Sequence, residues 1–105
     1  MKDVLKLSEQ KGVLTARLSA EIDHHSCRGM REEIDLALFD KRPRTLVLDF
    51  SEVGFMDSSG LGLILGRAEK AEAIGAAVEV RGLSEGLMRI VRLSGIEKIK
   101  NLKIK

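Results

Sequence analysis

The sequence predicts one α/β domain over residues 1–105, with a mixed sheet of about four or five strands and helices packed on it. Short apolar runs typical of strands alternate with stretches in which apolar residues recur every three or four positions. Glycines or a proline separate most of these segments. A length of 105 residues suits one compact domain and is too short for two. The predicted order is β-β-α-β-α-β-α.

The first third of the chain predicts a hairpin followed by a helix. The apolar residues Val4, Leu5 and Leu7 precede a polar break over residues 8–12, and residues 13–18 form the next predicted strand. Gly12 suits the turn between the two strands. Asp23 is a plausible N-cap for a helix over residues 24–40, because a carboxylate can accept from the first free amides. Its predicted buried stripe contains Cys27, Met30, Ile34, Ala37 and Leu38.

The middle of the chain predicts a buried strand and a second helix. Pro43 ends the first helix. Residues 45–50 are almost continuously apolar, which predicts a strand covered on both faces. Asp57 opens the second helix, and Gly75 ends it. Its apolar positions are Leu61, Ile64, Leu65, Ala68 and Ala71.

The last third predicts a strand over residues 77–80, broken by Gly82, and a short helix between Ser84 and Gly95. Residues 96–105 alternate loosely between Ile or Leu and Lys, and fit a strand or a frayed helix equally well. Strands that alternate with helices need crossover connections, so the later strands are predicted to be parallel. The apolar positions of the short helix are Leu87, Met88, Val91 and Leu93.

Composition excludes several classes of protein. Eighteen basic and 16 acidic residues give a net charge of +2, and the aromatic content is 3%, so neither a nucleic-acid partner nor a base-stacking RNA module is expected. Cys27 is the only cysteine, which excludes an internal disulfide and suits a reducing compartment. The longest apolar run, residues 60–66, is far shorter than the roughly 18 residues of a membrane span. Without a secretory signal, a cytoplasmic location is expected and no membrane partner.

The glycine series Gly60, Gly62 and Gly66 offers one functional hypothesis, a nucleotide-binding site, with Glu79 near the spacing of a ribose-binding acid. Against it, nine residues separate the glycines from the preceding strand, where the fingerprint requires a tight turn directly after the strand. Glu79 also lies inside a predicted strand. Close packing of the helix on the sheet is the stronger explanation for Gly66. For Gly60 and Gly62 both explanations stay open.

Two further chemistries find little support. Asp23, His24, His25 and Cys27 do not predict a metal site, because adjacent histidines diverge by about 100° on a helix and no second cluster completes the ligand set. Ser58 and Ser59 lack the Gly-x-Ser-x-Gly context of a nucleophile, and a hydroxyl without a base is a weak nucleophile. No metal, cofactor or catalytic residue is therefore predicted.

Phosphorylation of Ser58 is a second functional hypothesis for this segment. With Asp57 as N-cap, Ser58 and Ser59 fall in the first helical turn, where the backbone amides are free. A phosphoserine carries about −1.5 to −2 charges, which the helix dipole tolerates. Across an interface, like charges cost several kcal/mol. Ser58 could thus act as a binding switch while the fold persists, although the physics permits this without requiring it.

Three segments resemble one known family. Residues 55–67 (FMDSSGLGLILGR) resemble the signature of STAS domains, specifically the anti-sigma factor antagonists of spore-forming bacteria. Residues 21–25 (EIDHH) and 93–96 (LSGI) resemble two further stretches of the same family. With the order of elements, the resemblance covers nearly the whole chain, and its sporulation branch, which acts in the sigma-F pathway, is the most similar.

The resemblance implies a non-enzymatic regulator. A monomer is expected, because the sequence leaves no heptad pattern or long apolar face for a second copy. The unphosphorylated form binds an anti-sigma factor with serine kinase activity and thereby releases the sigma factor. The kinase phosphorylates the first serine of Asp-Ser-Ser-Gly, here Ser58, and a serine phosphatase restores binding. A stress-response or stressosome pathway remains an alternative to sporulation. The residues expected to bind the partner are Asp23, His24, Asp57, Ser58, Ser59, Gly60 and Gly62.

Overall fold

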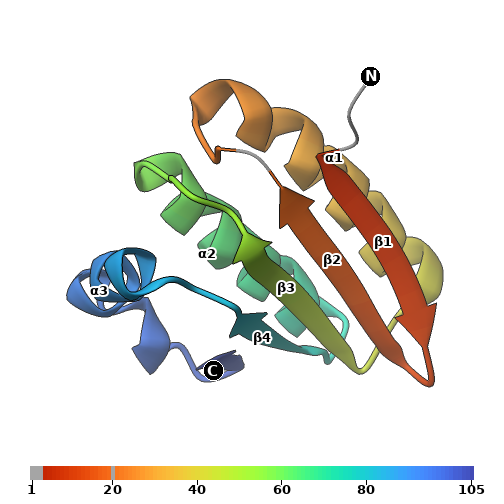
Figure 1. The fold of residues 1–105 in the computed structure, drawn as a ribbon. Coiled ribbons are helices and arrows are strands. Elements are labelled where there is room, and N and C mark those ends of the chain that lie inside the picture. The colour runs from red at the N-terminus through yellow and green to blue at the C-terminus, as the bar shows by residue number, and fades with distance from the viewer. Residues whose placement is uncertain (1–3, 20) are drawn as a thin grey trace.

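The computed structural model describes residues 4–19 and 21–105, which form one five-stranded sheet flanked by helices (Figure 1). The strands lie in the order β1-β2-β3-β4-β5 across the sheet. The elements along the chain are β1 (Leu5–Gln10), β2 (Val13–Ser19), α1 (His24–Lys41), β3 (Thr45–Glu52), α2 (Ser58–Ala73), β4 (Ala77–Arg81), α3 (Glu85–Ser94), the 3₁₀ turn η1 (Ile96–Lys98) and β5 (Leu102–Ile104).

The sheet is mixed, as predicted. β1 and β2 form an antiparallel hairpin, and β2 to β5 are parallel to one another. The predicted α/β class and the order of its first seven elements are confirmed. The last residues form β5, whose Leu102 is buried opposite Val78. The predicted polar break after Leu7 is wrong, since β1 continues to Gln10. Backbone pairing with β2 needs no apolar side chains at these positions.

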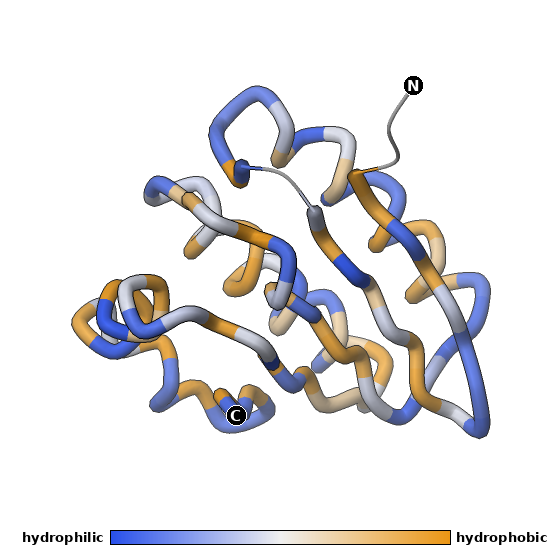
Figure 2. The backbone as a smooth tube through the Cα atoms, in the orientation of Figure 1, coloured by the Kyte–Doolittle hydropathy of each residue, from blue (hydrophilic) through white to orange (hydrophobic). Residues whose placement is uncertain are grey.

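The core lies on one face of the sheet, which α1 and α2 cover (Figure 1). In Figure 2 the hydrophobic stretches of β2, β3 and β4 lie next to one another. Alternate residues of these strands enclose the core, and its largest fully buried side chain is Phe50. The sheet positions on this face are Leu14, Ala16, Leu18, Leu46, Leu48, Phe50, Val78 and Val80.

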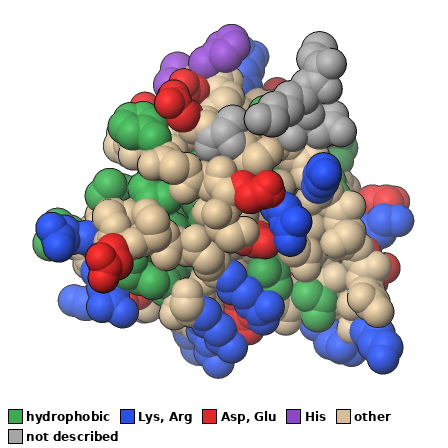
Figure 3. Space-filling view, in the orientation of Figure 1, with side chains coloured by type: hydrophobic (Ala, Val, Ile, Leu, Met, Phe, Trp, Pro, Cys, Tyr) green, Lys and Arg blue, Asp and Glu red, His purple; other side chains and the backbone are tan. Residues whose placement is uncertain are grey.

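The prediction that the strand at residues 45–50 is covered on both faces is wrong. The opposite face of the sheet carries charged side chains (Figure 3), among them Arg17 paired with Asp49 at 3.3 Å and Glu79 paired with Arg81. Val47 is the one residue of β3 that is buried on this side. Val47 lies between Leu46 and Leu48, so the apolar residues of β3 follow one another without a gap. This pattern wrongly indicated that both faces of the strand are covered.

The buried stripe of α3 consists of Leu87 and Val91. Leu93, which the sequence assigned to this stripe, is 82% exposed. Two residues beyond Val91 along an α-helix is a rotation of about 200°, which turns Leu93 away from the core.

Gly82 follows the last residue of β4 and lies close to the backbone of Ser51. Its φ is +79°, and a Cβ atom here would lie 2.7 Å from the amide nitrogen of Ser51. Gly75 has a similar φ of +75° but open space around it. We expect Gly75→Ala to lower the free energy of unfolding by about 1–2 kcal/mol from backbone strain alone. Gly82→Ala should cost clearly more, measured by urea unfolding. Equal losses would contradict the close approach to Ser51.

Candidate functional site

The loops after β2 and β3 are joined by backbone hydrogen bonds. The Ile22 amide donates to the Phe55 carbonyl at 2.9 Å, and the Asp57 amide donates to the Ile22 carbonyl at 3.1 Å. Ile22 and Met56 form this parallel bridge, and both side chains are buried. The bridge therefore sets the N-termini of α1 and α2 beside each other at one end of the sheet (Figure 1).

Asp23 caps α1 through a reciprocal pair of hydrogen bonds. The Ser26 amide donates to Asp23 Oδ1 at 2.8 Å, and the Asp23 amide donates to Ser26 Oγ at 3.1 Å. The bond from the Ser26 amide is the main cause that lowers the pKa of Asp23, so the carboxylate is charged at neutral pH. The predicted N-cap is confirmed. His24 is the first residue of the helix and is exposed, as is His25.

Asp57 caps α2 in the predicted way. The Ser59 amide donates to Asp57 Oδ1 at 2.7 Å, and the Gly60 amide donates to the Asp57 carbonyl at 2.9 Å. Ser58 is the first residue of the helix, and it is exposed. The site thus presents an exposed serine at the N-terminus of a helix that an aspartate caps.

Ser59 differs from Ser58 in its surroundings. It is half-buried, and its carbonyl accepts a hydrogen bond from the Cys27 thiol at 3.2 Å. Burial raises the pKa of the Cys27 thiol, which keeps the proton on sulfur for this bond. α1 therefore contacts the backbone of Ser59, whereas Ser58 is exposed to solvent. Of the two hydroxyls, Ser58 is the one a partner protein reaches more easily.

The three glycines all lie within α2, so they do not form the tight turn of a dinucleotide-binding site. Gly60 is buried, and a Cβ atom there would lie 2.6 Å from Met56 Sδ and 3.0 Å from Met56 Cβ. Gly62 is exposed and has open space around it. A Cβ at Gly66 would meet no atom within 4 Å, so close packing does not explain this glycine and that prediction is wrong. Gly60 is the residue that packing requires.

Arg67 is the residue that the sequence analysis missed. It is only 4% exposed, and its Nε lies 2.8 Å from Asp35 Oδ1 of α1. Burial is the main cause that lowers the pKa of this guanidinium. A signal was present, because Arg67 lies three residues after Ile64 and four before Ala71, both on the buried stripe of α2. A charged residue at such a position is easily assigned to solvent.

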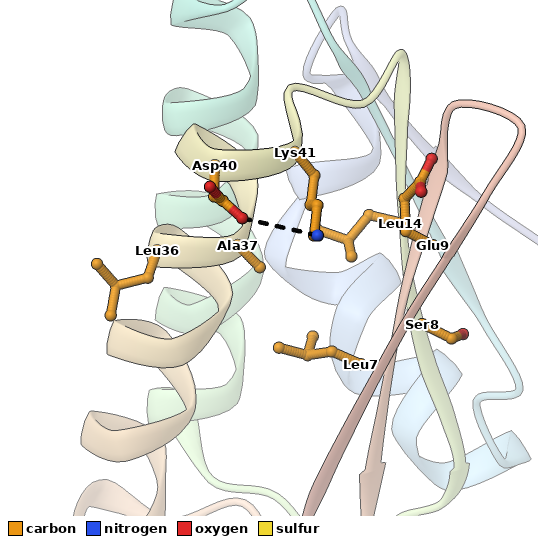
Figure 4. A pocket seen from close by; sticks show the side chains of 8 residues that line it. All are labelled: Leu7, Ser8, Glu9, Leu14, Leu36, Ala37, Asp40 and Lys41. Carbon is orange, nitrogen blue, oxygen red and sulfur yellow. Dashed lines mark ion pairs between the residues drawn. The ribbon is translucent and has the colours of Figure 1, made fainter.

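Other features of the described chain do not add to this site. A hollow between β1 and α1 is lined by residues that include none of the predicted partner-binding positions, and Lys41 and Asp40 form an ion pair of 3.7 Å at its edge (Figure 4). Within residues 4–19 and 21–105, no three His, Cys, Asp or Glu side chains are grouped to hold a metal ion. No helix in the same residues has the length and apolar character needed to cross a membrane.

The two glycines next to Ser58 give a matched test of this geometry. Gly62→Ala should raise the free energy of unfolding by about 0.5–1 kcal/mol, because alanine favours a helix and no atom opposes its methyl group. Gly60→Ala should be less stable than Gly62→Ala by about 1–3 kcal/mol, since its methyl group collides with Met56. Urea unfolding of both variants measures the difference. Equal stability would show that Met56 does not constrain Gly60.

Comparisons with known proteins agree with this arrangement. The chain is 36% identical over 95 residues to an anti-sigma F factor antagonist of Paenibacillus polymyxa, covering 90% of this chain and 81% of that protein. Its fold matches the anti-sigma factor antagonist SpoIIAA in its unphosphorylated form with a TM-score of 0.75 and 26% identity, covering 96% of this chain and 86% of that one. It matches the phosphorylated form of the Bacillus cell fate determinant SpoIIAA with a TM-score of 0.74 and 28% identity, covering 96% and 90%.

The family assignment follows from a match that spans almost the whole chain. Residues 5–104 fit the STAS domain profile, which extends from the first residue of β1 to the last residue of β5. The chain therefore belongs to the STAS domain family.

Proposed function

We propose that this protein is an anti-sigma factor antagonist whose binding is controlled by phosphorylation of Ser58. In the cytoplasm, the unphosphorylated form binds an anti-sigma factor with serine kinase activity, which releases the sigma factor. The kinase then phosphorylates Ser58, the complex separates, and a serine phosphatase restores binding. The names of the relatives and the geometry around Ser58 support this proposal.

The observation that carries the proposal is the exposed Ser58 at the start of α2, held beside the N-terminus of α1. A partner that contacts both helix N-termini covers the Ser58 hydroxyl. Asp23 and His24 supply the α1 side of this surface, and Asp57 the α2 side. Gly62 carries no side chain, so the surface beside Ser58 stays low enough for the nucleotide of a kinase to approach.

Charge explains how the switch can act without unfolding the domain. A phosphoryl group on Ser58 adds about −1.5 to −2 charges at a helix N-terminus, where the dipole is favourable. For SpoIIAA, both the phosphorylated and the unphosphorylated form match the present fold almost equally. In the complex the same charge would be enclosed with Asp57 and Asp23 by the partner. Like charges forced together in this way cost several kcal/mol.

The catalytic groups belong to the kinase in this scheme. Phosphoryl transfer needs Mg²⁺, a nucleotide and a residue that positions the attacking hydroxyl. Asp57 uses Oδ1 to cap the helix, and its charge helps to orient the incoming kinase. The protein itself is the substrate and contributes no catalytic residue.

Similarity favours the sigma-F pathway among the pathways that use such antagonists. The 36% identity to the antagonist of Paenibacillus polymyxa supports a partner of the anti-sigma F type. Incubation with purified kinases of the sigma-F type and of the stress-response type tests this choice. Phosphate transfer from the stress-response type alone would contradict it.

Substitutions of the two serines test the residue assignment. Ser58→Ala should abolish phosphate incorporation by the cognate kinase and keep the binding, because the hydroxyl is removed and no charge is added. Ser58→Asp should weaken binding by about tenfold or more through like-charge repulsion. Its far-UV circular dichroism should match the wild type. Intact-mass spectrometry with site mapping measures the phosphate, and calorimetry measures the binding.

Ser59→Ala is the matched control, since it removes the neighbouring half-buried hydroxyl. It should still accept phosphate on Ser58, because the target hydroxyl is present. Phosphate mapped to Ser59 in the wild type would overturn the assignment, and so would undiminished binding by Ser58→Asp.

A further inference from the structure

A charged pair joins α1 and α2 far from the exposed site. Arg67 is 4% exposed, and its Nε lies 2.8 Å from Asp35 Oδ1. Arg67 Nε and Nη1 and Asp35 Oδ1 are buried and make no hydrogen bond within the described residues, so the contact between the two side chains is an ion pair. Replacing a buried ion pair by apolar residues often leaves stability unchanged or raises it, so stability alone is a weak reason for such a pair.

The pair repeats the register of a second contact between the same helices. The Cys27 thiol donates to the Ser59 carbonyl at 3.2 Å near the helix N-termini, between residues 32 positions apart. Asp35 and Arg67 are separated by the same 32 positions, about two turns further along. α1 and α2 therefore run side by side in the same direction (Figure 1) with a constant offset.

Arg31 makes one shifted register of α1 unfavourable. It lies one helical turn before Asp35, on the side of α1 that faces Arg67, and its charge acts on both Cys27 and Arg67. If α1 moved by one turn along α2, Arg31 would take the place of Asp35, and two like charges would meet in the interface.

We propose that the Asp35–Arg67 pair fixes the register of α1 against α2 and so holds Asp23 at its working position beside Ser58. In this role the two residues act as positioning residues for the docking surface, through the setting of α1. This inference rests on the proposed function for its binding consequence. Its structural consequence is that the pair stabilises the backbone hydrogen bonds of Ile22 with Phe55 and Asp57, and this can be measured in the free protein.

The test removes both charges at once. In Asp35→Leu with Arg67→Met, apolar side chains replace the pair, so no unpaired charge is left in the interface. We expect urea unfolding to give a higher midpoint than either single variant, because each single variant leaves its former partner uncompensated. All measurements on the double variant are made at a temperature where circular dichroism shows it to be fully folded.

The first measurement needs no partner. Hydrogen exchange of the Ile22 and Asp57 amides should be about tenfold faster in the double variant, while amides of β3 keep their rates. Equal exchange at the bridge in the variant and the wild type would overturn the inference. Faster exchange that spreads equally to β3 would also overturn it, since that pattern reports a general loss of stability.

The second measurement uses a purified anti-sigma factor kinase that phosphorylates the wild-type protein. The double variant should lose about tenfold in kcat/KM for Ser58 phosphorylation. The single variant Arg67→Lys, which keeps a cation opposite Asp35, should lose less. Glu32→Ala is the control, because its carboxylate is exposed on α1 and pairs with Arg28 at 3.9 Å. It should change neither measurement. A wild-type protein that no kinase modifies would count against the proposed function and leave the exchange result standing.

Discussion

The two backbone hydrogen bonds between Ile22 and the segment of Phe55 to Asp57 are the constraint on which the rest of the site depends. β2 and β3 are adjacent and parallel, so the loops that follow them leave the sheet at the same end. The bridge ties these loops together, and an aspartate then begins a helix from each. A local pairing of two loops thereby becomes a surface that belongs to two helices.

The buried residues that support this surface are distinct from the exposed serine that can be modified. Ile22, Met56 and Gly60 are buried beneath the surface and hold the helix ends in place. Ser58 is exposed and its side chain is not part of the core, so a phosphoryl group there lies in solvent. A modification can therefore alter the charge of the surface strongly while the supporting contacts remain as they are.

The sequence was sufficient for features that depend on neighbours along the chain. Asp23 and Asp57 were predictable as caps because each accepts from amides two or three residues ahead. Features that depend on what lies across the fold were not predictable. The open face of β3 and the burial of Arg67 against Asp35 both involve a second element as well. Nothing in the local pattern distinguished Gly60, which is packed, from Gly66, which is not.

The most direct test of the central claim compares two forms of one protein. The dissociation constant for the same anti-sigma factor is measured by calorimetry with the unmodified chain and with the chain carrying phosphate on Ser58, after circular dichroism has verified both folds. The account predicts binding that is weaker by at least about tenfold for the phosphorylated form, with identical spectra. Equal affinity of the two forms would contradict it.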